Sequence, residues 1–287
     1  MIGRLKSHLR LIASGEAPLY YRAALRRRLV RARVRRSPGG RLVFPVYDGV
    51  VATLRESDDL TLRAYMDGID QPIVHTLERL LRPGMTVVDV GANTGLYTVI
   101  CARLVGPGGR VHSFEPVPGL GGRVRENAEL NGLANVEVYG SGLGARAGSF
   151  RLHLSGSGGD GWSSLYPAEW TGPEAVEVPV ETLDGWMERR DVERIDLLKV
   201  DVEGAELDVL RGARRSLAEG RIGAVVVEFN RDTQEAGGFS AEEMERTLAE
   251  AGFRWHVLPW TPGDQAPVDW AALPRLCDLV AVREGAP

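Results

Sequence analysis

The sequence contains 287 residues, 44% hydrophobic and 26% charged, with a formal net charge of −4, a composition typical of a soluble globular protein. That length suffices for one large α/β domain, and no apolar run reaches the roughly 18 residues that a membrane span requires. Arginines interrupt the apolar stretches near the N-terminus, which argues against a secretory signal, so we expect a cytoplasmic protein without a membrane span.

Residues 1–36 are predicted to form a basic helical arm. They hold 11 lysines and arginines against a single acid, so the arm carries +10 and the remainder of the chain −14. Ile2, Leu5, Leu9 and Ile12 recur at helical spacing. A structural cap, a contact with an acidic ligand, a membrane or nucleic-acid contact and a homo-oligomer contact all remain open for the arm. The acidic remainder argues against a general nucleic-acid binder.

Residues 37–82 are predicted to lead into the main domain. Residues 41–44 and 50–54 have the composition of two short strands joined by a turn, and residues 73–81 place their apolar side chains at helical spacing. A Pro-Gly pair then stops that helix.

Residues 83–287 alternate between apolar strands and helices, which predicts a doubly wound, mostly parallel sheet. Strands are predicted at 86–90, 110–114, 136–139, 195–200 and 224–229, and helices at 96–105, 122–131, 206–215 and 241–251. Two further strands, at 253–258 and 276–283, would close a seven-stranded sheet with an antiparallel C-terminal hairpin at its edge.

The segment from Gly140 to Pro179 breaks this alternation. It is rich in glycine and serine, with aromatic residues between them, and only 150–154 has the pattern of a strand. We predict a long variable loop, at about 155–175, on the ligand face. Trp162 could cover a substrate there or simply pack within the loop.

The run Val87 to Gly95 (VVDVGANTG) is the strongest chemical motif. It follows a buried strand and opens a helix, where a glycine loop permits a tight turn and close approach to a ligand. Asp89 would repel the pyrophosphate of a dinucleotide, whereas it suits the ammonium and sulfonium of S-adenosylmethionine. Glu115 ends the next strand, 20 residues after Gly95, at the distance of an acid that binds ribose hydroxyls.

Five motifs together resemble the FkbM family of methyltransferases and cover roughly residues 72–230. They are Asp89 to Gly95, Phe114-Glu115-Pro116, Glu126-Asn127 with Asn131, Leu183-Asp184, and the run Leu198 to Glu206 (LKVDVEGAE). The resemblance implies a Rossmann-like class I methyltransferase fold, S-adenosylmethionine as methyl donor, and acceptors that are commonly hydroxyls of natural products and sugars.

The donor site predicted from these motifs draws on the ends of several strands. Its members are Asp89, Gly91, Asn93, Thr94, Gly95, Thr98, Glu115, Pro116, Ser141, Gly142 and Asp201. An NAD(P)-dependent oxidoreductase is a rival interpretation, but it would favour a third glycine where Thr98 stands. A non-catalytic binding module with the same fold is another.

Lys199, Asp201 and Glu228 are the predicted catalytic residues, at the ends of neighbouring strands. Lys199 is one of only two lysines in the chain, and it could accept a hydroxyl proton if burial lowers its pKa, or hold the developing alkoxide. A purely structural pairing of Lys199 with Asp201 or Glu203 remains open. Glu228 could be a base or a substrate anchor.

Asp201, Glu228 and Asn230 also resemble the ligand set of metal-dependent catechol-type methyltransferases, which makes Mg²⁺ possible, although no metal ligand is assigned. The function predicted overall is SN2 methyl transfer to a hydroxyl of a small molecule. An N-methyltransferase and a Mg²⁺-dependent O-methyltransferase of the same fold are the alternatives.

Overall fold

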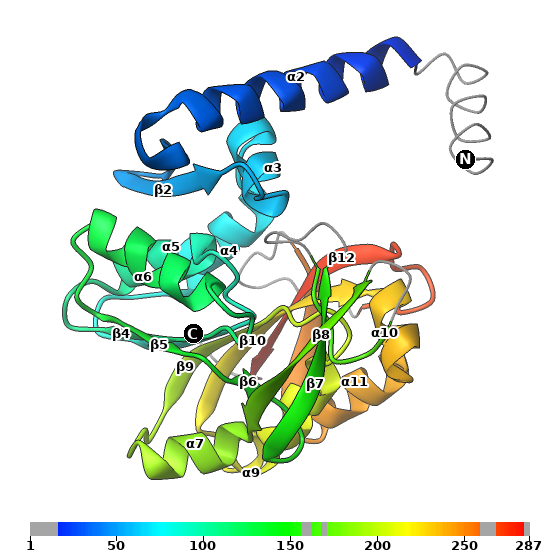
Figure 1. Cartoon of the computed structure of the whole chain (residues 1–287). Coiled ribbons are helices and arrows are strands. Elements are labelled where there is room, and N and C mark those ends of the chain that lie inside the picture. Colours follow the sequence, from blue (N-terminus) through cyan, green and yellow to red (C-terminus); the bar gives the residue numbers. More distant parts are fainter. Residues whose placement is uncertain (1–16, 156–161, 168–170, 259–267, 284–287) are drawn as a thin grey trace.

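The structure is a computed structural model that describes residues 17–155, 162–167, 171–258 and 268–283 (Figure 1). Every structural statement below concerns these residues. The helical pattern of Ile2, Leu5, Leu9 and Ile12 lies outside them.

A seven-stranded sheet forms the centre of the chain, in the order β11-β12-β10-β9-β3-β4-β5. Its members are β3 (Thr86–Val90), β4 (Arg110–Phe114), β5 (Val136–Tyr139), β9 (Ile195–Val200), β10 (Ile222–Asn230), β11 (Phe253–Val257) and β12 (Leu276–Arg283). The predicted mostly parallel sheet with an antiparallel C-terminal hairpin is confirmed. The antiparallel strand is not at the edge, however, because β12 lies between β10 and β11, where Leu279 and Ala281 are completely buried.

Helices cover both faces of this sheet (Figure 1). On one face α4 (Gln71–Leu80) and α5 (Leu96–Val105) pack Leu77 and Ile100 against alternate strand residues such as Val87. On the other face α7 (Leu183–Arg189), α8 (Glu206–Gly212) and α11 (Ala241–Ala249) pack against the intervening residues, such as Val88. Burial on both faces is what the continuous apolar strands predict.

Three further helices belong to this part of the chain. They are α6 (Leu120–Leu130), which packs against α5 and β5, α9 (Arg214–Ala218) and α10 (Arg231–Gly237). The predicted helix 206–215 is therefore two short helices, α8 and α9, and α10 directly follows β10.

The segment predicted as a long loop contains a second sheet of three strands, β6-β8-β7. They are β6 (Gly142–Leu143), β7 (Gly148–Ser155) and β8 (Thr171–Glu181). The expectation of a loop at about 155–175 is therefore wrong from Thr171 onward, where β8 begins. The apolar residues of β8 alternate, and Val178 and Val180 pack on Leu152, but glycine, proline and glutamate elsewhere in the strand mask the pattern.

The N-terminal part adds α2 (Ala17–Arg36), a 3-10 turn η1 (Pro38–Gly40), the hairpin β1 (Arg41–Tyr47) and β2 (Val50–Arg55), and α3 (Leu60–Asp67). In Figure 1, α2 runs along the outside of the molecule, beside β2 and α3. Val34 near its end is buried, whereas Leu25 and Leu29 are exposed. The role of this arm stays a prediction. None of the helices described is both long and apolar enough to cross a membrane.

A buried ion pair holds this hairpin against the main domain. Arg123 in α6 donates to both carboxylate oxygens of Asp58, at 2.9 and 2.8 Å, and also to the backbone carbonyl of Thr53. Asn127, one turn later, accepts a hydrogen bond from the Thr53 backbone and donates to the Thr94 carbonyl. The hairpin, α6 and the glycine loop are thus one connected unit.

The loops after β3 and β9 lie against each other at Gly91. A methyl group at this position would overlap the backbone carbonyl of Asp201, and the φ angle of Gly91 is +78°. Only glycine meets both conditions without strain.

We therefore expect Gly91→Ala to lower the free energy of unfolding by more than about 2 kcal/mol, measured by urea unfolding. As a control, Gly122→Ala in α6 adds a methyl group with no atom within 4 Å, and should leave stability unchanged or raise it by about 0.5–1 kcal/mol. Equal stability of Gly91→Ala and wild type would contradict this close approach.

Candidate active site

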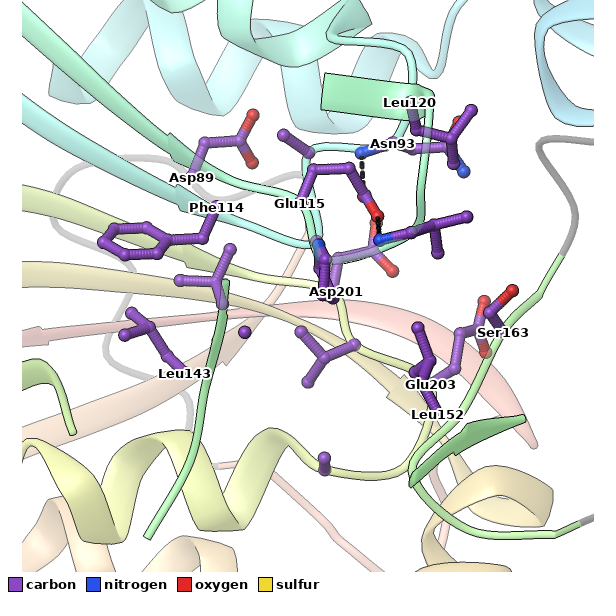
Figure 2. A pocket seen from close by; sticks show the side chains of 18 of the residues that line it. Asp89, Asn93, Phe114, Glu115, Leu120, Leu143, Leu152, Ser163, Asp201 and Glu203 are labelled. Atoms are coloured by element: carbon purple, nitrogen blue, oxygen red, sulfur yellow. Dashed lines mark hydrogen bonds between the residues drawn. The ribbon is translucent and has the colours of Figure 1, made fainter. Parts of the chain in front are cut away.

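A pocket opens at the carboxyl ends of β3, β4 and β9, the edge at which ligands bind in doubly wound sheets (Figure 2). α3 contributes Leu60 and Thr61 to its wall, and the β7–β8 sheet contributes Leu152 and Val178. The second sheet thus closes one side of the pocket with apolar side chains.

Most of the predicted donor-site residues line this pocket. They are Asp89, Gly91, Asn93, Thr94, Glu115, Pro116, Gly142 and Asp201. Three others do not line it and have different partners. Gly95 makes room for α6, because a methyl group there would lie 3.0 Å from the Val124 side chain. Thr98 donates to Asp89 at 2.6 Å, and Ser141 donates to Glu181 at 2.8 Å.

Glu115 is fixed by the backbone. Its two carboxylate oxygens accept hydrogen bonds from the backbone N–H groups of Asn93, at 2.7 Å, and Val117, at 2.8 Å (Figure 2). Burial nevertheless raises the pKa of Glu115 to about 7, and these hydrogen bonds oppose the rise. Each oxygen retains a lone pair for a further donor, so the carboxylate is a preorganised acceptor of hydroxyl groups.

Lys199 lies between two carboxylates and beneath an aromatic ring. Its Nζ is 2.9 Å from Oδ2 of Asp201, 3.9 Å from Oδ1 of Asp89, and 4.8 Å from the centre of the Tyr97 ring. Lys199 and Asp89 are almost completely buried. Burial alone would lower the pKa of Lys199, but the charges of Asp201 and Asp89 raise it above its ordinary value.

Lys199 is therefore a charged donor. The condition set for a general base, a pKa lowered by burial, is not met. Its pairing with Asp201 corresponds to the structural alternative left open above, and its charge remains compatible with holding an oxygen anion.

Strand register explains why so many acids meet here. Residues paired across neighbouring strands share a face of the sheet, and Asp89 pairs with Lys199 while Glu228 pairs with Asp278. Val226 pairs with Lys199, so Glu228, two residues further, lies on the same face as Asp201. Four acids, Asp89, Asp201, Glu228 and Asp278, thus form one row on the face of the sheet that α4 and α5 cover.

The acids of this row have raised pKa values because burial and mutual repulsion disfavour their charge. Burial, followed by the charges of Asp201 and Glu203, raises the pKa of Glu228 to about 10. Burial, with Asp201 next, raises the pKa of Asp278 to about 7. The positive charge of Lys199 opposes both shifts without cancelling them.

Glu203 is a pocket residue to which sequence reasoning assigned no role of its own. Its φ angle is +53°, and burial, then Asp201 and Glu206, raise its pKa to about 9. Its backbone carbonyl accepts a hydrogen bond from Ser164, which ties the segment 162–167 to the pocket. The sequence feature that could have identified Glu203 is its position in the run Leu198 to Glu206, two residues after Asp201.

Asn230 is not part of this group. Its side-chain oxygen accepts a hydrogen bond from the backbone of Asp232 and caps α10. The suggested set of Asp201, Glu228 and Asn230 is therefore wrong in its third member. Glu203 instead brings a carboxylate oxygen within 4.8 Å of oxygens of Asp201 and Glu228. Trp162 lines the pocket with 40% of its surface exposed, while Trp170 lies outside the described residues.

Comparison with known proteins identifies the family of the chain. The profile described as "Methyltransferase FkbM domain" matches residues 89–255. This chain belongs to the FkbM family of methyltransferases. That range begins at Asp89, the acid at the end of β3, and includes the whole acidic row except Asp278.

Three relatives illustrate the range of similarity. Methyltransferase 1 of Beauveria bassiana is 33% identical over 44% of this chain, and the match spans 57% of that protein. The 2-O-methyltransferase NoeI of Sinorhizobium fredii is 29% identical over 61% of this chain and 76% of its own. The hexuronic acid methyltransferase AglP of Haloferax volcanii is 27% identical over 63% of this chain and 69% of its own.

The chemistry open to this FkbM site follows from its charges. Among the described residues, four carboxyl groups line the pocket, those of Asp89, Glu115, Asp201 and Glu203, together with one cation, Lys199. No arginine of the described part of the chain lines it, although arginine supplies nearly all basic residues of the sequence. Such a pocket favours ligands with positive charge and hydroxyl groups, and disfavours phosphates.

We expect Lys199→Met to destabilise the fold by about 3–5 kcal/mol at pH 8, because Asp89 and Asp201 would lose their counter-ion. The pKa of Asp89, already raised by burial, would rise further. An acid whose pKa is raised on folding stabilises the fold at low pH and loses that stabilisation as the pH rises, so the defect should be smaller at pH 6. Thermal unfolding at both pH values measures this.

A control variant and a rescue variant accompany this measurement. Arg214→Met removes an exposed cation and should have little effect at either pH. Adding Asp89→Asn to Lys199→Met should recover part of the lost stability. A Lys199→Met protein as stable as wild type at pH 8 would show that the ion pairs contribute nothing.

Proposed function

We propose that this FkbM methyltransferase transfers a methyl group from S-adenosylmethionine to a hydroxyl group of a small molecule. The observation that carries the proposal is the acidic pocket at the carboxyl ends of β3, β4 and β9, with its preorganised Glu115. When bound, S-adenosylmethionine supplies an electrophilic methyl group on a positively charged sulfur.

The residues present fit such a donor. Glu115 offers lone pairs to ribose hydroxyls, in the position expected of a ribose-binding acid. Oδ1 of Asp89 has no hydrogen-bond partner among the described residues, although Lys199 lies 3.9 Å away. A buried carboxylate oxygen of this kind favours a donor with positive charge. Asn93, Pro116 and Gly142 complete the proposed donor wall.

The transfer itself needs an oriented hydroxyl and a proton acceptor. Lys199 keeps its charge and would stabilise the oxygen as negative charge develops. Asp201 and Glu203 are the carboxylates on the acceptor side of our proposal. Asp201 would take the proton, because the raised pKa of Glu203, about 9, keeps Glu203 protonated at neutral pH. Glu228 does not line the pocket, so we place it behind Asp201 as a group that tunes the local charge.

A small hydroxylated acceptor is supported by the names of two relatives, a 2-O-methyltransferase and a hexuronic acid methyltransferase. The apolar wall from β7, β8 and Trp162 would pack against the carbon skeleton of the acceptor. We propose that the acceptor carries no negative charge beside the methylated oxygen, because a carboxylate there would meet Asp201 and Glu203; the acid group of a sugar acid would have to lie away from them.

The donor is tested by following tryptophan fluorescence during titration with S-adenosylhomocysteine or NADH. We expect saturable quenching with S-adenosylhomocysteine only, and a weaker signal in Trp162→Phe, since Trp162 lines the pocket. NADH binding without S-adenosylhomocysteine binding would overturn the proposal in favour of an oxidoreductase. Transfer of labelled methyl groups to hydroxyl and amine acceptors would then distinguish oxygen from nitrogen as the methylated atom.

The pH dependence of S-adenosylhomocysteine binding should report on Glu115. Its pKa of about 7 means that it is increasingly protonated below neutral pH, whereas ribose hydroxyls require the charged form as acceptor. We expect affinity to fall as the pH drops from 8 to 6, by up to about tenfold per pH unit below the pKa. Calorimetry measures this.

Glu115→Gln should bind weakly at pH 8 and show a flatter pH profile than wild type. Glu129→Gln, an exposed substitution in α6, should reproduce the wild-type profile. A Glu115→Gln protein with unchanged affinity and pH profile would remove Glu115 from the donor site.

A further inference from the structure

Two acids of the row, Asp201 and Glu228, converge with a third carboxylate, that of Glu203. Single oxygens of Asp201, Glu203 and Glu228 lie within 4.8 Å of one another. Asp201 and Glu203 come from the loop after β9, and Glu228 comes from the neighbouring strand β10. The parallel register of β9 and β10 therefore holds all three acids together.

One positive charge, that of Lys199, acts on this point. Its ammonium pairs with Asp201 and lies 3.9 Å from Asp89, so it opposes the repulsion at Glu203 and Glu228 without cancelling it. Glu203 has 9% of its surface exposed, and its Oε2 has no hydrogen-bond partner in the part of the chain described here. Glu228 is paired across the sheet with a further acid, Asp278. A buried carboxylate without a partner costs free energy unless a cation accompanies it.

The spacing fits a metal ion. Oxygen ligands lie 2.3–2.6 Å from Ca²⁺ and 2.0–2.1 Å from Mg²⁺, so two ligands on opposite sides of an ion are separated by roughly 4–5 Å. Three carboxylates with no nitrogen or sulfur ligand favour hard ions such as Mg²⁺, Mn²⁺ and Ca²⁺ over Zn²⁺. We propose that Asp201, Glu203 and Glu228 bind one divalent metal ion of this hard class.

The metal site would adjoin the methyl-transfer pocket without being identical to it. Asp201 and Glu203 line the pocket, whereas Glu228 lies behind it, so the ion would occupy the boundary between pocket and sheet. Binding of the ion does not require methyl donor or acceptor. The proposal is therefore separate from the proposed function and can fail without it.

Direct binding tests the site. The full chain is stripped with a chelator and titrated with Mn²⁺, followed by electron paramagnetic resonance, with Mg²⁺ and Ca²⁺ as competitors. We expect one Mn²⁺ per chain in wild type, and affinity at least about tenfold weaker in Glu203→Gln and Glu228→Gln, because each loses a charged ligand. Glu250→Gln, an exposed substitution near the end of α11, should bind as wild type does.

Thermal unfolding supplies the second readout. The glutamine variants keep the shape of the side chain and remove repulsion, so we expect them to fold without metal. Added Mn²⁺ should raise the unfolding temperature of wild type and of Glu250→Gln, but not that of the two other variants. Absence of binding at millimolar Mn²⁺, or wild-type binding by both variants, would overturn the proposal. Stabilisation by ethanolamine in place of metal would also overturn it and assign the site to an organic cation.

Discussion

The ammonium of Lys199, held between Asp89 and Asp201, is the interaction on which the site depends. β3 and β9 are adjacent parallel strands, and each has an acid beside its carboxyl end, Asp89 within β3 and Asp201 just after β9. Burial makes that arrangement unfavourable without a cation. Lys199 supplies one positive charge from within the sheet itself. Because it is shared between two carboxylates and covered by Tyr97, it cannot also neutralise the acids on β10 and β12.

The same strands fix the shape of the pocket. Gly91 allows the loop after β3 to lie against the backbone of Asp201, so donor loop and acid loop form one surface. Glu115 reaches this surface from β4 and is held there by backbone N–H groups from Asn93 and Val117. Rigid strand ends therefore determine where each charge lies, and the second sheet only encloses them.

Much of this could be predicted from the sequence, because parallel strands are continuous apolar runs. β3, β4, β5 and β9 begin and end as predicted, and Asp89 and Glu115 line the pocket. β8 was missed because its alternating valines lie among glycine, proline and glutamate, and composition was given more weight than period. The register between strands is a long-range property, so the meeting of Glu228 with Glu203 could not be derived from local patterns.

The direction of the pKa shift of Lys199 could not be inferred from this residue alone, because it depends on the neighbouring acids. A lone buried lysine suggests a lowered pKa, whereas Asp201 and Asp89 reverse that shift. The rarity of lysine in this arginine-rich chain then has a different explanation. A compact ammonium fits between two carboxylates and beneath Tyr97, while a planar guanidinium needs wider, forked contacts. Lysine at this position is therefore a compact positive charge that fits between Asp89 and Asp201. The carboxyl groups that Lys199 does not contact, among them Glu203 and Glu228, determine which further cations the site can bind.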